Sequence, residues 1–191
     1  MLIFVCGGVR SGKTLVGENI AEHITNPEHD ILYLAAGMPV DSEMIERIER
    51  HKHSRSHKLK TWKTIEKPYN LHEIIPSLKQ EDTIFLDCLT TWLGNEMYVN
   101  GRDKELDLPF NLLNDISELQ QNSTHLVIIS NDIFMEALPQ DPFTYRYTNH
   151  LGKLHQELVK EAGAAISVEF GKMVFRKGEH DERLNRVGND I

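Results

Sequence analysis

Cysteine, long apolar runs and an excess of basic residues are missing from this sequence, and each shortage excludes a class of protein. Its two cysteines, Cys6 and Cys88, lie in separate apolar runs; we therefore expect buried free thiols, which suits a reducing cytoplasm, and no disulfide framework. Carboxylates outnumber Lys and Arg by 29 to 21, giving a net charge of −8, which argues against a dedicated nucleic-acid binder with a basic face. The apolar start at residues 1–5 has no basic leader, and no stretch is long enough to cross a bilayer, so we expect neither a signal peptide nor a membrane span.

The chain length and its alternating pattern predict the fold class. At 191 residues, 40% of them hydrophobic, the chain suits a single domain over residues 1–191. Short apolar runs without polar alternation are typical of strands covered on both faces. These runs are residues 2–5, 31–35, 83–86, 126–129, 165–170 and 173–175. Amphipathic segments that predict helices lie between them, at residues 13–24, 41–53, 71–78, 112–121 and 147–162. The alternation predicts an α/β fold with a mostly parallel sheet, with exposed loops at 100–109 and 140–142 and an irregular tail over 177–191.

One segment near the start carries a specific phosphate-binding pattern. It comprises Gly7, Gly8, Val9, Arg10, Ser11, Gly12, Lys13 and Thr14, which fit G-x-x-x-x-G-K-[ST]. The segment follows an apolar strand and precedes a helix, as the mechanism requires. Glycines let successive amide hydrogens converge on phosphate oxygens, and the helix adds its positive end. The sequence therefore predicts a purine nucleoside triphosphate, with Lys13 on its β- and γ-phosphates and the Thr14 hydroxyl on Mg²⁺.

A second carboxylate is expected near that metal ion. Asp87 ends the run 83–86 as a magnesium-binding aspartate of a P-loop enzyme does, although an ordinary residue at a strand end fits the same pattern. Ligands of wound sheets bind at the carboxyl ends of the strands. We therefore expect the P-loop, Asp87 and the turn formed by Ala35, Ala36 and Gly37 to meet there.

The segment after the expected helix 41–53 is rich in histidine and basic residues. It contains His51, Lys52, His53, Ser54 and Arg55. Met44, Ile48 and His51 share one helical stripe, and an imidazole flanked by cations could attack phosphorus. On this pattern alone, a helix end whose basic residues complement the helix dipole is favoured. A zinc site from His51, His53 and His57 lacks a fourth ligand at suitable spacing.

Several segments together resemble the bifunctional adenosylcobinamide kinase and adenosylcobinamide-phosphate guanylyltransferase family. They are the loop 7–13 (GGVRSGK), residues 41–44 (DSEM), 47–48 (RI), 51–52 (HK), 62–66 (WKTIE) and 86–91 (LDCLTT). The glycine loop and the His-Lys pair together are far more specific than a P-loop alone. The resemblance extends from Leu2 to about Phe175.

The resemblance implies a RecA-like P-loop fold, a homotrimer and two activities. The kinase activity would phosphorylate adenosylcobinamide with ATP or GTP; the transferase activity would move GMP from GTP onto adenosylcobinamide phosphate and release pyrophosphate. The family's guanylylated histidine falls on His51, so the resemblance favours a nucleophile there. The implied GTP contacts are the P-loop, Ala35 to Gly37, Lys52 to Arg55, Glu66 and Asp87, where relatives often carry Glu. Mg²⁺ would be held by Thr14 and Asp87.

The second half departs from the family pattern. Residues 131–134 read NDIF where relatives tend to have Asn-Glu-Val-Gly, and the later charged signature is altered between Thr148 and Gln156. Two alternatives therefore stay open. One is a divergent nucleotide-binding paralogue that has lost one or both activities, and the other is an unrelated small-molecule P-loop kinase.

Overall fold

In the computed structural model, the described part of the chain folds into one sheet flanked by helices. The described residues are 1–38, 58, 60–78, 81–134, 140–178, 183, 184 and 187, with only the backbone at 81 and 82. The strands are β1 (Leu2–Gly7), β2 (Ile31–Ala35), β3 (Trp62–Glu66), β4 (Glu81–Asp87), β5 (Ser123–Asn131), β6 (Ala164–Glu169) and β7 (Lys172–Lys177). The helices are α1 (Lys13–Ile24), α3 (Leu89–Tyr98), α4 (Leu108–Gln121) and α5 (Pro142–Glu161), with short 3-10 turns η1 (Leu71–Glu73) and η2 (Ile75–Ser77).

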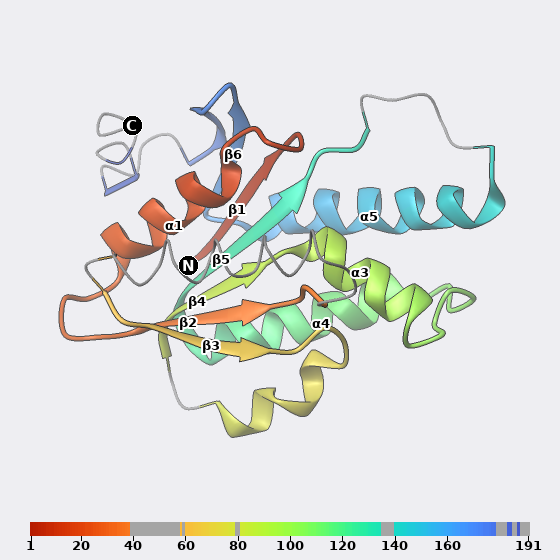
Figure 1. Ribbon diagram of the computed structural model, residues 1–191, viewed down its shortest axis with the longest axis horizontal. Helices are drawn as coiled ribbons and strands as arrows, with labels where there is room; N and C mark the ends of the chain where they lie inside the picture. Colours follow the sequence, from red (N-terminus) through yellow and green to blue (C-terminus); the bar gives the residue numbers. More distant parts are fainter. Residues whose placement is uncertain are drawn as a thin grey trace.

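The strands form one sheet in the order β3-β2-β4-β5-β1-β6-β7. All neighbours pair in parallel except β6 and β7, which form an antiparallel hairpin. The parallel strands therefore end at the same edge, on the right of Figure 1. This arrangement confirms the predicted α/β, RecA-like fold class with a mostly parallel sheet.

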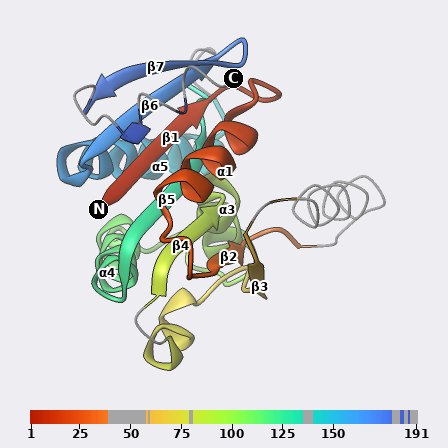
Figure 2. The ribbon, with the colours of Figure 1, turned by 90° about the vertical axis from the view of Figure 1, so that its left-hand side faces the viewer.

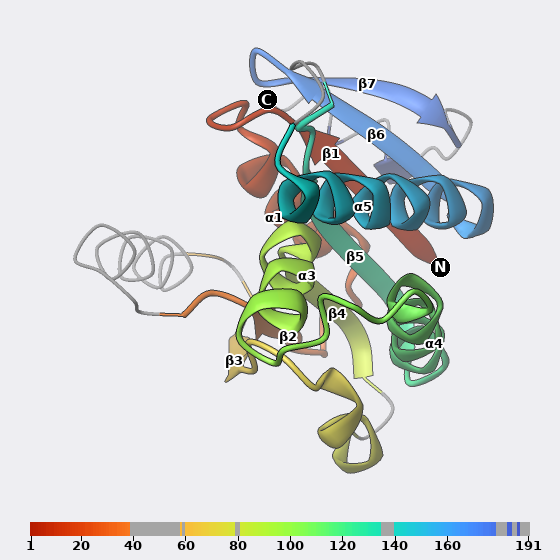
Figure 3. The same ribbon diagram turned by 90° about the vertical axis from the view of Figure 1, so that its right-hand side faces the viewer.

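Helices cover both faces of the sheet, which explains why the strands read as continuous apolar runs. On one face α1 packs through Val16, Ile20 and Ala21 onto Val5 and Phe85, and Figure 2 shows α1 on this side. On the other face α3, α4 and α5 lie side by side (Figure 3), where Trp92, Leu112 and Leu154 are fully buried. Within the described ranges, no helix combines the length and the apolar character that a membrane crossing requires.

The six expected strands and the helix 13–24 are confirmed, and the differences have local causes. The expected helix 71–78 is two 3-10 turns, because Pro76 cannot donate the backbone hydrogen bond that a continuous helix needs. Both α4 and α5 begin earlier than expected, because Pro109 and Pro142 occupy first-turn positions, where no donor is required. The expected helix 41–53 lies outside the described residues.

Two elements were not expected from the sequence, and part of the tail joins the core. Strand β3 contains only two apolar residues in its five positions, and α3 is ten residues long with a Gly inside, so each gives a weak periodic signal. In the tail that we expected to be irregular, Leu184 and Val187 are helical and buried on the α1 side of the sheet.

Candidate functional site

The phosphate-binding pattern forms a loop between the end of β1 and the start of α1. Gly12 is the residue before the helix and has φ of 89°, in the left-handed region that glycine adopts most readily. Lys13 begins α1 and is 5% exposed, with its Nζ donating a 3.1 Å hydrogen bond to the carbonyl of Gly8 across the loop. The Ser11 amide also donates to the Gly8 carbonyl, at 3.2 Å. The lysine is thus folded back over the loop's concave side, where a phosphate would lie.

At the base of this loop, the backbone of Gly7 lies close to the Ser11 side chain and to the Val168 carbonyl. A Cβ atom on Gly7 would lie 2.6 Å from both the Ser11 Oγ and the Val168 carbonyl oxygen, so only glycine fits there. The Ser11 Oγ is buried and has no hydrogen-bond partner among the described residues. A buried hydroxyl without a partner costs free energy, and a phosphate oxygen in the loop would satisfy it.

The hairpin of β6 and β7 supports the loop from outside. The Gly171 amide in its two-residue turn donates a 3.0 Å hydrogen bond to the Ser11 carbonyl, and the Gly171 Cα lies 3.5 Å from the position of a Cβ on Gly12. The exposed top of the loop is formed by Val9 and Arg10, and Arg10 has φ of 61°. A hairpin far along the chain thus fixes the shape of an N-terminal loop.

Asp87 ends β4 on the face of the sheet that α1 covers. Its side chain follows Phe85 on the same side of the strand, and Phe85 packs against α1. The Tyr33 hydroxyl donates a 2.7 Å hydrogen bond to Asp87 Oδ2, and the Tyr33 and Phe85 rings stack with centroids 5.5 Å apart. Only β5 lies between β4 and β1, which separates Asp87 from the P-loop by about 10 Å, two inter-strand spacings.

The chemistry of these oxygen donors suits magnesium. Mg²⁺ prefers oxygen ligands and retains several waters, so one carboxylate and one hydroxyl are sufficient protein ligands beside substrate phosphates. Asp87 and Thr14 offer those two groups. Among the described side chains, no group of three or more His, Cys, Asp and Glu is arranged to hold a metal ion.

The other predicted nucleotide contacts lie on the two strands beyond Asp87. Ala35 pairs with both Asp87 and Glu66 in the sheet register. The Ala36 amide donates to the Asp87 carbonyl at 2.9 Å, and Gly37 follows, partly exposed. The Glu66 side chain is exposed at the end of β3. The carboxyl ends of the strands from β1 to β3 thus form a continuous edge from the P-loop to Glu66. This edge covers four inter-strand spacings, about 19 Å.

The histidine segment follows the turn after β2 in the sequence and precedes β3. His51, Lys52, His53, Ser54 and Arg55 lie outside the described residues. The described chain stops after Met38 and continues at Lys58, whose Nζ lies 3.5 Å from a Glu18 carboxylate oxygen and 2.9 Å from Asn19 Oδ1 on α1. The described residues that flank the segment are thus Met38, next to Gly37, and Lys58, which contacts α1.

The divergent stretch after β5 packs around a partly buried histidine. His155 of α5 forms a 2.7 Å hydrogen bond through Nε2 with the Ser130 hydroxyl, and its ring packs edge-on against Phe4 and Phe134. Burial lowers the pKa of His155 to about 4, a shift that the nearby Asp132 opposes. Burial also raises the pKa of Cys6, next to the P-loop, to about 12. A neutral imidazole and a protonated thiol at these positions are packing groups.

Sequence reasoning missed two polar side chains that hold the edge together. Tyr33 lies within an apolar run, and its hydroxyl is the only signal that could have drawn attention to it. Asn95 lies in the unexpected helix α3, where its amide donates to carbonyls of two different loops. Neither role follows from spacing, because their partners are distant in the sequence.

Comparisons with known proteins support the same family across nearly the whole chain. The family model described as cobinamide kinase / cobinamide phosphate guanyltransferase matches residues 3–175. The chain is 27% identical over 182 residues to the bifunctional adenosylcobalamin biosynthesis protein CobU of Escherichia coli (strain K12), covering 90% of this chain and 97% of the relative. It is 28% identical over 176 residues to the protein of that name from Salmonella typhimurium (strain LT2), covering 85% and 92%.

A solved structure supports the fold independently of the sequence. A KaiC-like protein from Pyrococcus horikoshii OT3 is similar with a TM-score of 0.51 and 10% identity, over 94% of this chain and 79% of the other. At that identity the similarity concerns the fold alone.

Proposed function

Because the chain belongs to the cobinamide kinase / cobinamide phosphate guanyltransferase family, we propose that it carries out both reactions of adenosylcobinamide activation. In the first, ATP or GTP phosphorylates the aminopropanol hydroxyl of adenosylcobinamide. In the second, GTP transfers GMP to the phosphate so formed and releases pyrophosphate. The observation that supports this most directly is the shared edge: the P-loop, Asp87 and the ends of β2 and β3 lie along one side of the sheet.

In the kinase reaction, the protein's contribution is to grip the triphosphate. Backbone amides of the loop and the amino end of α1 would bind the phosphate oxygens. Lys13 would exchange its hydrogen bond to the Gly8 carbonyl for the β- and γ-phosphates, and the Ser11 hydroxyl would gain a partner. Thr14 and Asp87 would hold Mg²⁺, which neutralises phosphate charge when bound. The substrate hydroxyl then attacks the γ-phosphorus, and the nucleoside diphosphate leaves.

In the transferase reaction, we propose His51 as the nucleophile. Its imidazole nitrogen would attack the α-phosphorus of GTP, forming a P–N bond as the bond to pyrophosphate breaks. A phosphate oxygen of adenosylcobinamide phosphate would then attack the same phosphorus and free the histidine. Splitting the displacement into two steps gives each one a positioned nucleophile. The segment that carries His51 begins beside Gly37, which supports this role.

Covalent labelling tests the transferase proposal. We expect the protein incubated with α-³²P-GTP and Mg²⁺ to retain a label that is acid-labile and base-stable, as a phosphoramidate is. His51→Ala should abolish the label. His57→Ala, which removes a histidine of the same segment, is the matched control and should keep it. A label that persists in His51→Ala and is lost in His57→Ala would contradict the assignment.

Product analysis separates the two activities from the divergent alternative. With adenosylcobinamide and GTP, both wild type and His51→Ala should form adenosylcobinamide phosphate. Only wild type should convert this phosphate to the GDP-linked product. Lys13→Ala should lose both products, because the triphosphate is no longer held. Labelling of His51 without any corrinoid product would instead support a paralogue that has lost turnover.

We also propose a cytoplasmic homotrimer. The family resemblance supports the subunit number, and three exposed aromatic side chains on neighbouring helices, Tyr98, Phe143 and Tyr145, offer apolar surface for contact between copies. Free Cys6 and Cys88 suit a reducing compartment. Sedimentation equilibrium should give three times the chain mass of 22.0 kDa; a monomer mass at all concentrations would exclude the trimer.

A further inference from the structure

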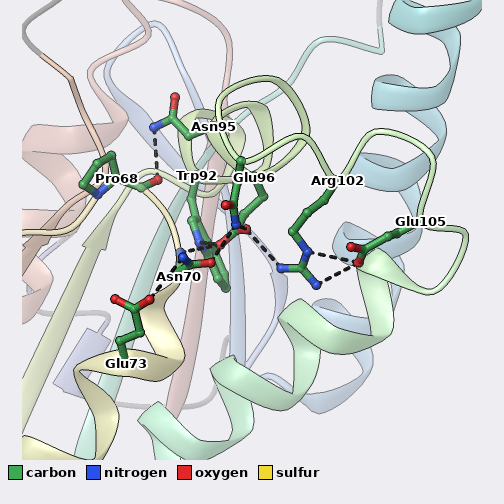
Figure 4. A network of polar contacts seen from close by, with 9 residues as sticks. Pro68, Asn70, Glu73, Trp92, Asn95, Glu96, Arg102 and Glu105 are labelled. Carbon is green, nitrogen blue, oxygen red and sulfur yellow. Dashed lines mark hydrogen bonds and ion pairs between the residues drawn. The ribbon is translucent and has the colours of Figure 1, made fainter.

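Asn95 of α3 joins the two loops that follow β2 and β3. Its Nδ2 atom donates a 2.8 Å hydrogen bond to the Ala36 carbonyl and a 3.1 Å hydrogen bond to the Pro68 carbonyl. Figure 4 shows the bond to Pro68. One amide group has two N–H donors, and both are used, each on a different loop.

These two loops lie at the far end of the site from the phosphate-binding loop. Ala36 is in the middle of the turn from Ala35 to Gly37, and Pro68 comes two residues after Glu66. Three inter-strand spacings, about 14 Å, separate the P-loop from the end of β2, and four, about 19 Å, separate it from the end of β3. A triphosphate held in the P-loop therefore cannot also fill the space beside Ala36 and Glu66. Only the ribose and base of a nucleotide held in the P-loop by its phosphates could extend to this end.

The helix that carries Asn95 is itself held rigidly beside the loops. The Glu96 side chain is fully buried and accepts three hydrogen bonds. They come from Trp92 Nε1 at 3.0 Å, from the backbone N–H of Asn70 at 2.7 Å and from the Arg102 guanidinium at 3.0 Å. Arg102 is fixed in turn by Glu105. Figure 4 shows this network around the C-terminal turns of α3. It ties α3 to Asn70, in the same loop as Pro68, so the Asn95 amide has a fixed base from which to hold that loop.

We propose that Asn95 is a positioning residue that sets the spacing between the loops after β2 and β3, so that they hold the nucleoside part of the nucleotide whose phosphates the P-loop binds. The inference rests on the proposed function. A side chain with no N–H donor leaves both carbonyls without this partner, and a carboxylate at position 95 repels them. The two loops then separate while the P-loop, on the other side of β4 and β5, keeps its shape.

The experiment compares two ligands that share phosphates and differ in the nucleoside. Binding of GTP and of inorganic tripolyphosphate, each with Mg²⁺, is measured by calorimetry for wild type, Asn95→Ala and Asn95→Asp. We expect GTP affinity to fall about tenfold in Asn95→Ala, as for the loss of one to two hydrogen bonds, and further in Asn95→Asp. Tripolyphosphate affinity should stay within about twofold of wild type.

A control with a similar loss of stability separates positioning from general damage. Thr83→Val removes a buried hydroxyl that accepts a 2.7 Å hydrogen bond from Thr25 at the opposite end of β4. It should lower the melting temperature yet leave affinity for both ligands unchanged. Equal weakening of both ligands in Asn95→Ala, or unchanged GTP affinity, would overturn the positioning role. Wild type that binds tripolyphosphate and not GTP would instead remove the proposed function on which the inference rests.

Discussion

The Tyr33 hydroxyl donates a 2.7 Å hydrogen bond to Oδ2 of Asp87, from the strand next to the one that Asp87 ends. Tyr33 is 5% exposed and stacked on Phe85, so the hydroxyl has little freedom to move. The bond occupies one carboxylate oxygen and leaves the other available. It therefore orients the carboxylate that we propose as a magnesium ligand.

Removal of this hydroxyl should weaken magnesium binding in the presence of nucleotide. In Tyr33→Phe, the carboxylate can rotate away, so the Mg²⁺ concentration that gives half-maximal GTP binding should rise about threefold to tenfold, as expected for loss of one charge-assisted hydrogen bond. Tyr147→Phe is a matched control, because its hydroxyl donates to the Thr90 carbonyl on the other face of the sheet. Titrations of Mg²⁺ at fixed GTP measure both. The same midpoint in the two variants would contradict the orienting role.

The base of the phosphate-binding loop should tolerate no side chain at position 7. In Gly7→Ala, the new methyl group would lie 2.6 Å from the Val168 carbonyl and the Ser11 Oγ, so the loop must shift, and we expect a loss of about 2 kcal/mol in the free energy of unfolding. Gly8→Ala meets no atom within 4 Å and should change stability by less than about 0.5 kcal/mol. Urea unfolding without nucleotide measures both. Equal stability of the two variants would show that the loop does not depend on the close approach at Gly7.

The partly buried His155 should make stability depend on pH in the acidic range. Unfolded, this histidine binds a proton near its ordinary pKa of 6.5, whereas burial lowers the pKa in the folded protein to about 4. Between these values the unfolded chain binds more protons, so stability falls as the pH drops from 6.5 to 4, by on the order of 3 kcal/mol. Above pH 6.5 the contribution is fully present and constant.

Replacement of the histidine by a neutral side chain isolates that contribution. In His155→Gln, the fall in stability that this histidine causes between pH 6.5 and 4 should disappear. At pH 8, any difference in the free energy of unfolding between the variant and wild type has a cause other than titration. Chemical unfolding curves at several pH values measure this. If the difference between the two proteins stays constant from pH 8 to pH 4, the imidazole has the same pKa in the folded and unfolded states, and the predicted shift is absent.

Much of the fold and part of the site could be predicted because their signals are local. The glycine loop, the strand before it and the helix after it occupy 23 consecutive residues, and the Gly12 conformation and the helix start at Lys13 follow from that short pattern. Asp87 was predicted from its place at the end of the apolar run 83–86, and Glu66 from the resemblance that includes segment 62–66. Strand β3 and helix α3 were missed because a short element with few apolar residues has little periodicity to detect.

The sequence by itself determined the strand composition, the phosphate-binding loop and the family, because each depends on residues adjacent in the chain or matched segment by segment. Only the tertiary structure decided that Tyr33 meets Asp87, that Gly171 supports Ser11, and that Asn95 joins the loops after β2 and β3. These contacts depend on the strand order and on which face of the sheet each helix covers. Both are set by the burial of apolar surface over the whole domain, a property that no single segment of the sequence contains.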